Sequence, residues 1–186
     1  MTTLLGTVAM VTGAGTGVGA AVAHRLDALG ALVAALDVEG TGAEVTAGAL
    51  HRAMAVKADP ADPAQLEAAI KSVHAHYGRL DVVVTTSSRP CQPANAAELS
   101  DHDWHTPLAD ILDTAFYALR AVLHTPATRV LAVIPVCAHN PARAAASAGA
   151  QALSSGTDRL TAVVTRCPAD LAATAAAVAR LAGATP

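Results

Sequence analysis

The chain has 186 residues, of which 53% are hydrophobic, 15% are charged and 2% are aromatic, so we expect one domain with a core of Ala, Val and Leu. The net charge of −3, without a block of Lys or Arg, argues against nucleic acid or an anionic membrane as a partner. The start has no secretory leader, no apolar run reaches the roughly 18 residues of a membrane span, and the three cysteines form no CxxC pair, which favours a soluble protein in the cytoplasm.

Apolar segments rich in β-branched residues alternate with Ala-rich segments along the chain. This alternation is typical of an α/β fold in which crossover helices join parallel strands. It predicts strands at Thr7–Thr12, Ala31–Asp37, Ala53–Lys57, Leu80–Thr85, Val130–Val136 and Leu160–Thr165. It predicts helices at Val18–Leu29, Gly42–Leu50, Pro63–Tyr77, Asp101–Leu123, Ala142–Ser154 and Pro168–Leu181. We therefore expect a Rossmann-type, doubly wound parallel sheet of about six strands in the order 3-2-1-4-5-6, in one domain over residues 1–186.

The first predicted helix opens with a glycine-rich turn. It follows the first strand directly and contains Gly13, Gly15, Thr16, Gly17, Val18 and Gly19. Glycines let the backbone approach a pyrophosphate closely, and the N–H groups and dipole of a helix N-terminus favour negative charge. The turn predicts a dinucleotide site, although a tight corner between strand and helix would also account for the glycines.

Asp37 ends the second predicted strand about 20 residues after the glycine turn. A carboxylate at this position accepts hydrogen bonds from the adenosine ribose and repels the 2′-phosphate of NADP. We therefore expect NAD as the cofactor, with NADP disfavoured. Asp37 could instead cap the turn that follows its strand.

Several segments resemble the short-chain dehydrogenase/reductase family. The glycine turn matches the family pattern T-G-x-x-x-G-x-G, residues 78–84 resemble the fourth strand, and Asp103-Trp104-His105 resembles the start of the fourth helix. The resemblance implies a nicotinamide dinucleotide as cofactor. It also aligns Asp59 with the family acid that lies beside the adenine, although Asp59 equally fits a turn or N-cap position before Pro60.

The loop after the fourth strand departs from the family pattern. Relatives have Asn-Asn-Ala-Gly there, whereas this chain has Thr85-Thr86-Ser87-Ser88. We expect Thr85 to remain beside the cofactor, without the usual polar contacts of this loop.

Family enzymes use an Asn, a Ser, a Tyr and a Lys for proton transfer. The resemblance places Ile111 at the Asn position, Pro135 at the Ser position, and Ala146 and Ala150 at the Tyr and Lys positions. The chain contains no Tyr-x-x-x-Lys motif, and Tyr117 falls on a different helix, where it should pack in the helical layer. We therefore expect the family's general acid catalysis, worth about 10²–10⁴-fold, to be absent.

The end of the chain also departs from the family. Cys167-Pro168-Ala169-Asp170 leads almost directly from the sixth strand into the last helix. Relatives carry a substrate-covering segment there and a seventh strand after that helix. The resemblance is thus to a family member truncated at its C-terminus.

Other candidate sites rest on position alone. Cys137, His139 and Ser88 follow strands at the edge where doubly wound sheets bind ligands, but a buried cysteine and a loop histidine need no function. The remaining candidates lack a metal-ligand spacing or a His–Asp partner pair and fit solvent-facing or capping roles: His102, His105, Ser147, Ser154 and Ser155. We predict no metal site.

Three functional hypotheses follow. The first is a catalytically silent, dinucleotide-binding family member that forms a homo- or hetero-oligomer with a family subunit through the helices at Asp101–Leu123 and Ala142–Ser154, because relatives commonly dimerise there. The second is a repurposed enzyme with non-redox or atypical chemistry on a small molecule. The third, an atypical NAD-dependent oxidoreductase, rests on fold analogy alone.

Overall fold

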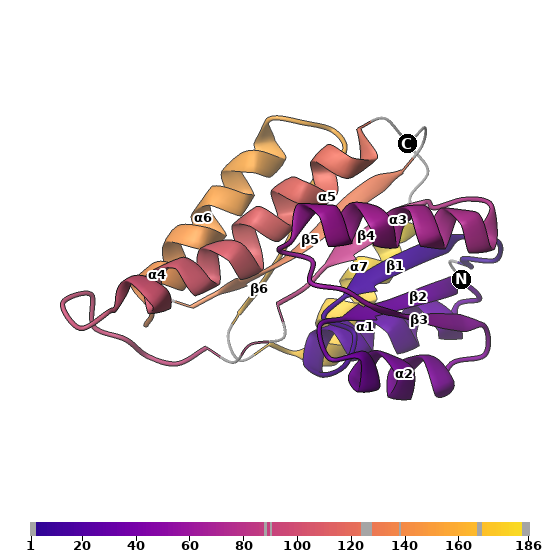
Figure 1. Cartoon of the computed structure of the whole chain (residues 1–186), viewed down its shortest axis with the longest axis horizontal. Helices are drawn as coiled ribbons and strands as arrows, with labels where there is room; N and C mark the ends of the chain where they lie inside the picture. The colour runs from indigo at the N-terminus through magenta and orange to yellow at the C-terminus, as the bar shows by residue number, and fades with distance from the viewer. Residues whose placement is uncertain are drawn as a thin grey trace.

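The computed structural model describes residues 3–87, 89, 91–123, 128–137, 139–166 and 169–183. Their strands form a six-stranded sheet in the order β3-β2-β1-β4-β5-β6, and every neighbouring pair is parallel. Helices cover both faces of this sheet (Figure 1). The predicted fold class and strand order are confirmed.

Each predicted strand is present, and the predicted helices are present with shifts at their ends, except that the helix predicted at Asp101–Leu123 is divided. The strands are β1 (Val8–Thr12), β2 (Leu32–Asp37), β3 (Ala53–Lys57), β4 (Val82–Thr85), β5 (Arg129–Val136) and β6 (Leu160–Arg166). The helices are α1 (Gly17–Ala28), α2 (Gly40–Gly48), α3 (Pro63–Tyr77), α4 (Asp101–Pro107), a π-helical segment η1 (Leu108–Asp113), α5 (Thr114–Val122), α6 (Pro141–Ser155) and α7 (Leu171–Ala182).

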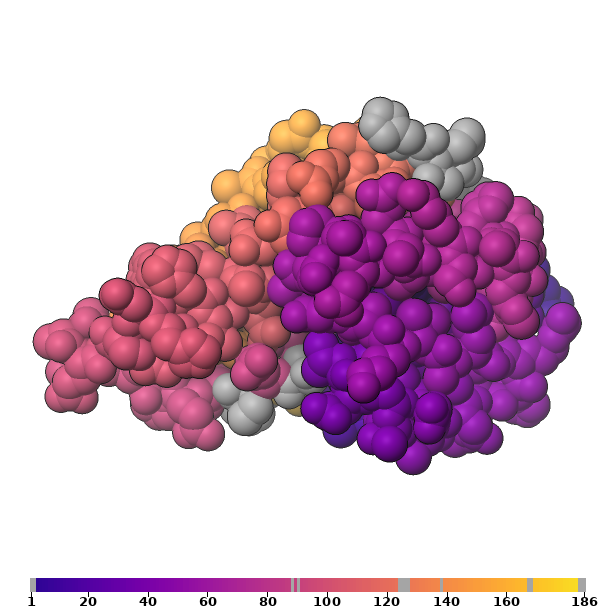
Figure 2. Space-filling view, in the orientation of Figure 1, coloured from indigo at the N-terminus to yellow at the C-terminus, as the bar shows by residue number. Residues whose placement is uncertain are grey.

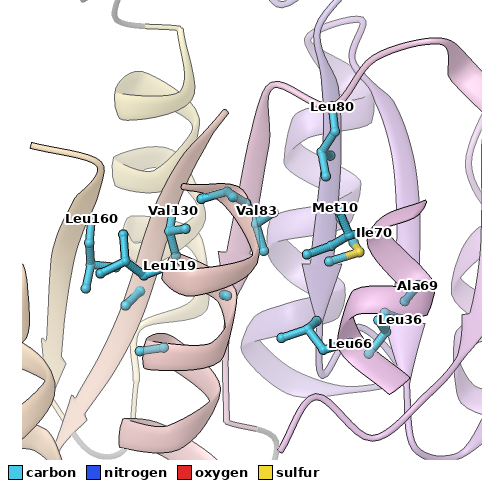
Figure 3. Packing of buried hydrophobic residues seen from close by; sticks show 14 of the residues in the cluster. Met10, Leu36, Leu66, Ala69, Ile70, Leu80, Val83, Leu119, Val130 and Leu160 are labelled. Carbon is cyan, nitrogen blue, oxygen red and sulfur yellow. The ribbon is translucent and has the colours of Figure 1, made fainter. Parts of the chain in front are cut away.

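The core consists of two apolar layers, one on each face of the sheet. On one face α3, α5 and α6 pack against the strands around Met10, Leu36 and Val83 (Figure 3). On the other face α1 and α7 pack together against the sheet around Val11 and Val33. Alanines contribute many of the buried positions, so the helices lie close to the sheet, as the composition predicts.

The helix α3 is capped at both ends. Asp62 is the N-cap, and its carboxylate accepts hydrogen bonds from the backbone N–H groups of Ala64 and Gln65. The hydrogen bond from the Gln65 side chain, with those backbone bonds, lowers the pKa of Asp62 below its usual value. The helix ends at Gly78, which adopts φ 76°, a left-handed conformation that favours glycine.

The helix predicted at Asp101–Leu123 is divided into α4, η1 and α5. The division begins at Pro107, because proline has no backbone N–H for the helical ladder and its ring crowds the preceding turn. The wider π-helical turns follow at once, and the Thr114 hydroxyl donates to the carbonyl oxygen of Ala109 at 3.1 Å. This segment carries Asp110 and Ile111, so it decides which side chains reach the cleft.

The last helix begins at Leu171, with Asp170 as its N-cap. It lies beside α1 on the face opposite α6 (Figure 1). Cys167 and Pro168, which belong to the predicted connection, lie outside the described residues. Within the described ranges, none of the helices combines the length and the apolar character that crossing a membrane requires.

The buried face of α3 generates a stability prediction. Leu66 is fully buried in the layer shown in Figure 3, so Leu66→Ala should lower the free energy of unfolding by about 2–5 kcal/mol in urea denaturation followed by circular dichroism. The same change at Leu5, which is 79% exposed, should change it by less than about 0.5 kcal/mol. Equal losses for the two variants would contradict this packing.

Candidate functional site

The glycine turn lies at the carboxyl end of β1 and forms the start of α1. Thr16 is the N-cap in an extended conformation, and Gly17 follows with φ 57°. The first N–H groups of a helix have no partners within it, so those of Gly17, Val18 and Gly19 are available to an anion. Gly17 and Val18 line a large cavity, as a phosphate-binding turn requires.

Close backbone approaches explain two of the glycines in this turn. A Cβ atom on Gly19 would overlap the carbonyl oxygen of Gly13 and would lie 2.9 Å from Oγ1 of Thr86. A Cβ atom on Gly15 would lie 2.8 Å from a carboxylate oxygen of Asp37 and 3.2 Å from Cα of Gly42. The turn is therefore closed tightly onto β4 and α2.

Asp37 is 6% exposed and holds this turn in place. Oδ2 accepts the backbone N–H of Gly15 at 2.8 Å, and Oδ1 accepts that of Glu39 at 3.0 Å. The second bond is the capping role considered for this residue. A carboxylate has about four acceptor positions, so two remain for a ligand in the cavity that Asp37 lines.

This smaller cavity has a volume of about 260 Å³ and an acidic lining. Its wall carries three acids, Asp37, Asp59 and Asp110, and one basic residue, Arg89. The exposed Asp59 accepts the backbone N–H of Ala61 at 2.9 Å, which is a turn role. The N-cap of the following helix is Asp62 and not Asp59, and Asp59 also lines the cavity wall.

A pair of threonines joins the two central strands at the cleft. The Thr86 hydroxyl donates to the carbonyl oxygen of Thr12 at 2.7 Å, and its N–H donates to the Thr12 hydroxyl at 3.1 Å. Thr86 lines both cavities, whereas the predicted contact residue Thr85 is buried as the last residue of β4. The hydroxyl of Thr46 in α2 also donates to the carbonyl oxygen of Ala14 at 2.7 Å.

The larger cavity has a volume of about 720 Å³ and extends from the start of α1 to the far side of β5. Pro135, Cys137 and His139 line it on the β5 side, and Leu171 lines it from α7. The segment around α4, at the left of Figures 1 and 2, projects beyond the sheet on the side where β5 ends. The cavity is therefore at the edge where doubly wound folds bind ligands.

The four residues that the sequence predicts at the family's catalytic positions contribute no proton donor to this cavity. Ile111, Ala146 and Ala150 are buried in the apolar layer, and Pro135 presents a ring without a donor to the cavity wall. Tyr117 packs against that layer, with the Arg120 guanidinium 5.1 Å from its ring centre. No tyrosine or lysine is among the described residues that line either cavity.

The remaining predicted candidates have local structural roles in the described part of the chain. Cys137 is buried and His139 is exposed at the cavity, while Ser88 lies outside the described residues. The Ser147 hydroxyl donates to the carbonyl oxygen of Pro135, and that of Ser154 donates to the carbonyl oxygen of Gln151. Ser155 also bonds within its helix, and the exposed imidazole of His105 bonds to the carbonyl oxygen of Asp101. Over the described ranges, no group of three His, Cys, Asp or Glu side chains is placed to hold a metal ion.

Sequence reasoning did not single out a polar network at the boundary between the cavities. Arg143 Nη2 donates to the hydroxyl of Ser87 at 3.1 Å, and that hydroxyl donates to Asp110 at 2.9 Å. Arg89 lies 3.5 Å from the same Asp110 oxygen. One signal was present in the sequence, because Arg143 is the only charged residue between Pro141 and Ser155.

Comparison with known proteins identifies relatives of the chain. A family model described as short chain dehydrogenase matches residues 7–152. D-threitol dehydrogenase from Mycolicibacterium smegmatis is 42% identical over 123 residues, which are 63% of this chain and 46% of the relative. The chain spans about half the length of the first curated relatives it matches.

Solved structures share the fold. The crystal structure of a short chain dehydrogenase from Mycobacterium smegmatis has a TM-score of 0.85 over 98% of this chain and 88% of that chain, at 26% identity. A 3-ketoacyl-(acyl-carrier-protein) reductase from Brucella melitensis, crystallised with NADH, has a TM-score of 0.81 over 92% of this chain and 80% of that chain. Its identity of 22% supports similarity of fold alone.

The contact at Gly19 generates a prediction about the turn. Gly19→Ala should lower the free energy of unfolding by about 1–3 kcal/mol in urea denaturation, because the added methyl group overlaps the Gly13 carbonyl. Gly48→Ala is the matched control, since nothing lies within 4 Å of a Cβ there, and it should be neutral or stabilising by up to about 1 kcal/mol. A Gly19→Ala protein as stable as the wild type would show that the turn is not closed in this way.

Proposed function

The chain belongs to the short-chain dehydrogenase family, and from this premise we propose that it binds a nicotinamide dinucleotide along the carboxyl ends of its strands. The observation that carries the proposal is the closed glycine turn at the start of α1, with a cavity on either side of Thr86. The adenosine half fits the smaller cavity beside Asp37 and Asp59. The pyrophosphate fits the N–H groups at Gly17 and Val18, and the nicotinamide half fits the larger cavity. When bound, the nicotinamide can accept or donate a hydride.

The acidic wall of the smaller cavity supports NAD over NADP. Asp37 and Asp59 both line it, and a 2′-phosphate there would bring a further negative charge close to buried Asp37. The ribose of NAD has hydroxyls instead, which can donate to the acceptor positions that Asp37 has left.

Isothermal titration calorimetry should show tighter binding of NADH than of NADPH. Asp37→Asn removes the charge and keeps an oxygen that can accept the Gly15 N–H, so we expect the ratio of the two affinities to fall by about ten-fold. Asp158→Asn, an exposed acid just before β6 at the opposite edge of the sheet, should leave that ratio unchanged. If neither dinucleotide binds at millimolar concentration, the glycine turn has a structural role only.

The cleft supports binding without the family's proton transfer. Ala146 and Ala150 are fully buried, so they supply neither the acid nor the cation that would tune it. We propose that the chain is a catalytically silent subunit that assembles with an active member of its family. The interface we propose is formed by α4–α5 and α6, which lie side by side (Figure 1) and expose Trp104 and Phe116.

The purified chain should show no appreciable oxidation of NADH or NADPH with common ketones. Its turnover, followed by absorbance of the reduced nicotinamide, should lie about 10²–10⁴-fold below that of a relative with the Tyr-x-x-x-Lys motif. The reaction without ketone gives the baseline. Rapid reduction by this chain would overturn the silent role, and its loss in Tyr117→Phe would then assign the acid to Tyr117.

Capture of a partner from cells tests the assembly role. We expect a family dehydrogenase to co-purify, its activity or stability to depend on this chain, and Gly17→Trp in this chain to leave that activity intact. If no family dehydrogenase co-purifies with the chain, the proposal of a silent subunit is wrong.

A second function is favoured by the size of the larger cavity, about 720 Å³, with His139 and Cys137 on its wall. In this second function the chain is an enzyme that keeps the fold of its family but converts a small molecule without transferring a hydride. This function requires that the isolated chain converts a substrate without consuming a dinucleotide and that His139→Ala abolishes the conversion.

A further inference from the structure

Arg143 carries a buried positive charge at the wall of the larger cavity. It lies in the first turn of α6 and is 4% exposed. Nη2 donates to the Ser87 hydroxyl at 3.1 Å, while Nε is buried without an acceptor. In the described part of the chain, its guanidinium forms no ion pair with a carboxylate.

The surroundings of Arg143 compensate this charge only in part. The Ser87 hydroxyl passes a hydrogen bond to Asp110 at 2.9 Å, and Arg89 lies 3.5 Å from the same carboxylate. One acid therefore serves two guanidinium groups. A buried cation is costly unless an anion pairs with it and its N–H groups find acceptors. Arg143 also lines a neighbouring cavity with Glu98 and Asp103, but its Nε has no acceptor, so this N–H can bind a further anionic group.

The rest of the cavity indicates what kind of molecule could supply that group. Its walls include the apolar side chains of Val18, Val133 and Leu171. Arg89, Arg166 and His139 add further basic groups, and none of the described residues that line it is Asp or Glu. Apolar walls with basic groups and no acid fit an anionic group carried on an apolar body.

We propose that the larger cavity binds a small molecule with an apolar body and a carboxylate or phosphate group, and that Arg143 pairs with this group. The planar guanidinium offers two parallel N–H donors, which match the two oxygens of such an anion. The proposal defines the ligand class for the second function above and does not require a bound dinucleotide. Because Gly17 and Val18 line the same cavity, the phosphate of a dinucleotide is the other possible source of the anion.

Calorimetry with 3-phenylpropionate and its neutral analogue 3-phenylpropan-1-ol tests the pairing. The carboxylate should bind the wild type more tightly than the alcohol does. Arg143→Met, which keeps an unbranched apolar chain and removes the guanidinium group, should weaken carboxylate binding by about ten-fold or more and leave alcohol binding unchanged. Arg25→Met, an exposed arginine on α1, is the matched control and should have no effect.

A second variant should change the affinity for the carboxylate in the opposite direction. Asp110→Asn removes the negative charge that the network shares, so carboxylate binding should tighten several-fold. Thermal unfolding of every variant without ligand shows whether it is folded. The proposal is overturned if the wild type binds the carboxylate and the alcohol with equal affinity. It is also overturned if the affinity for the carboxylate changes neither in Arg143→Met nor in Asp110→Asn.

Titration in saturating NADH separates the two sources of the anion. Unchanged carboxylate affinity supports a separate small molecule. Mutually exclusive binding, with NADH weakened by Arg143→Met to the same degree, overturns the separate molecule and assigns the anion to the dinucleotide. Carboxylate binding by a protein that binds no dinucleotide would support the anion site while refuting the dinucleotide proposal.

Discussion

The carbonyl oxygen of Gly13 occupies the space that a side chain at position 19 would need, and this contact joins the end of β1 to the start of α1. The other parts of the cleft depend on it. Asp37 reaches the backbone of Gly15 only because the turn lies against the end of β2, and Thr86 bonds to Thr12 beside the same turn. A side chain at position 15 or 19 would push the turn away from the ends of β1 and β2 and so would change the walls of both cavities.

The charges around this turn are distributed unequally. On the side of β2 and β3 the smaller cavity is lined by Asp37 and Asp59, and Arg89 lines both cavities. On the side of β5 and α6 the larger cavity is lined by Arg143 and Arg166, with no acid among its described residues. Such an arrangement favours a ligand with hydroxyl donors at one end and negative charge toward the other. Asp110 lies at the boundary and accepts from Ser87.

Small side chains explain how closely α6 packs in this protein. Ala142, Ala146 and Ala150 lie one helical turn apart on α6 and are fully buried. Their size allows α6 to pack closely against η1 and β5. In this chain the same face of the helix serves the core, and Arg143 on the preceding turn is the polar residue that reaches the cavity.

The sequence alone determined the sheet order, the place of the glycine turn and the position of Asp37, because these follow from local periodicity, strand ends and backbone sterics. The alignment of Ala146 with a catalytic position of the family stays a prediction from the sequence. Only the tertiary structure decided that Pro107 leads into a π-helical segment that brings Asp110 to the cleft. The contact between Arg143 and Ser87 joins residues 56 positions apart in the sequence, and no local sequence pattern predicts a contact over such a separation. Whether a polar residue faces solvent or a cavity depends on packing between distant elements, which periodicity does not specify.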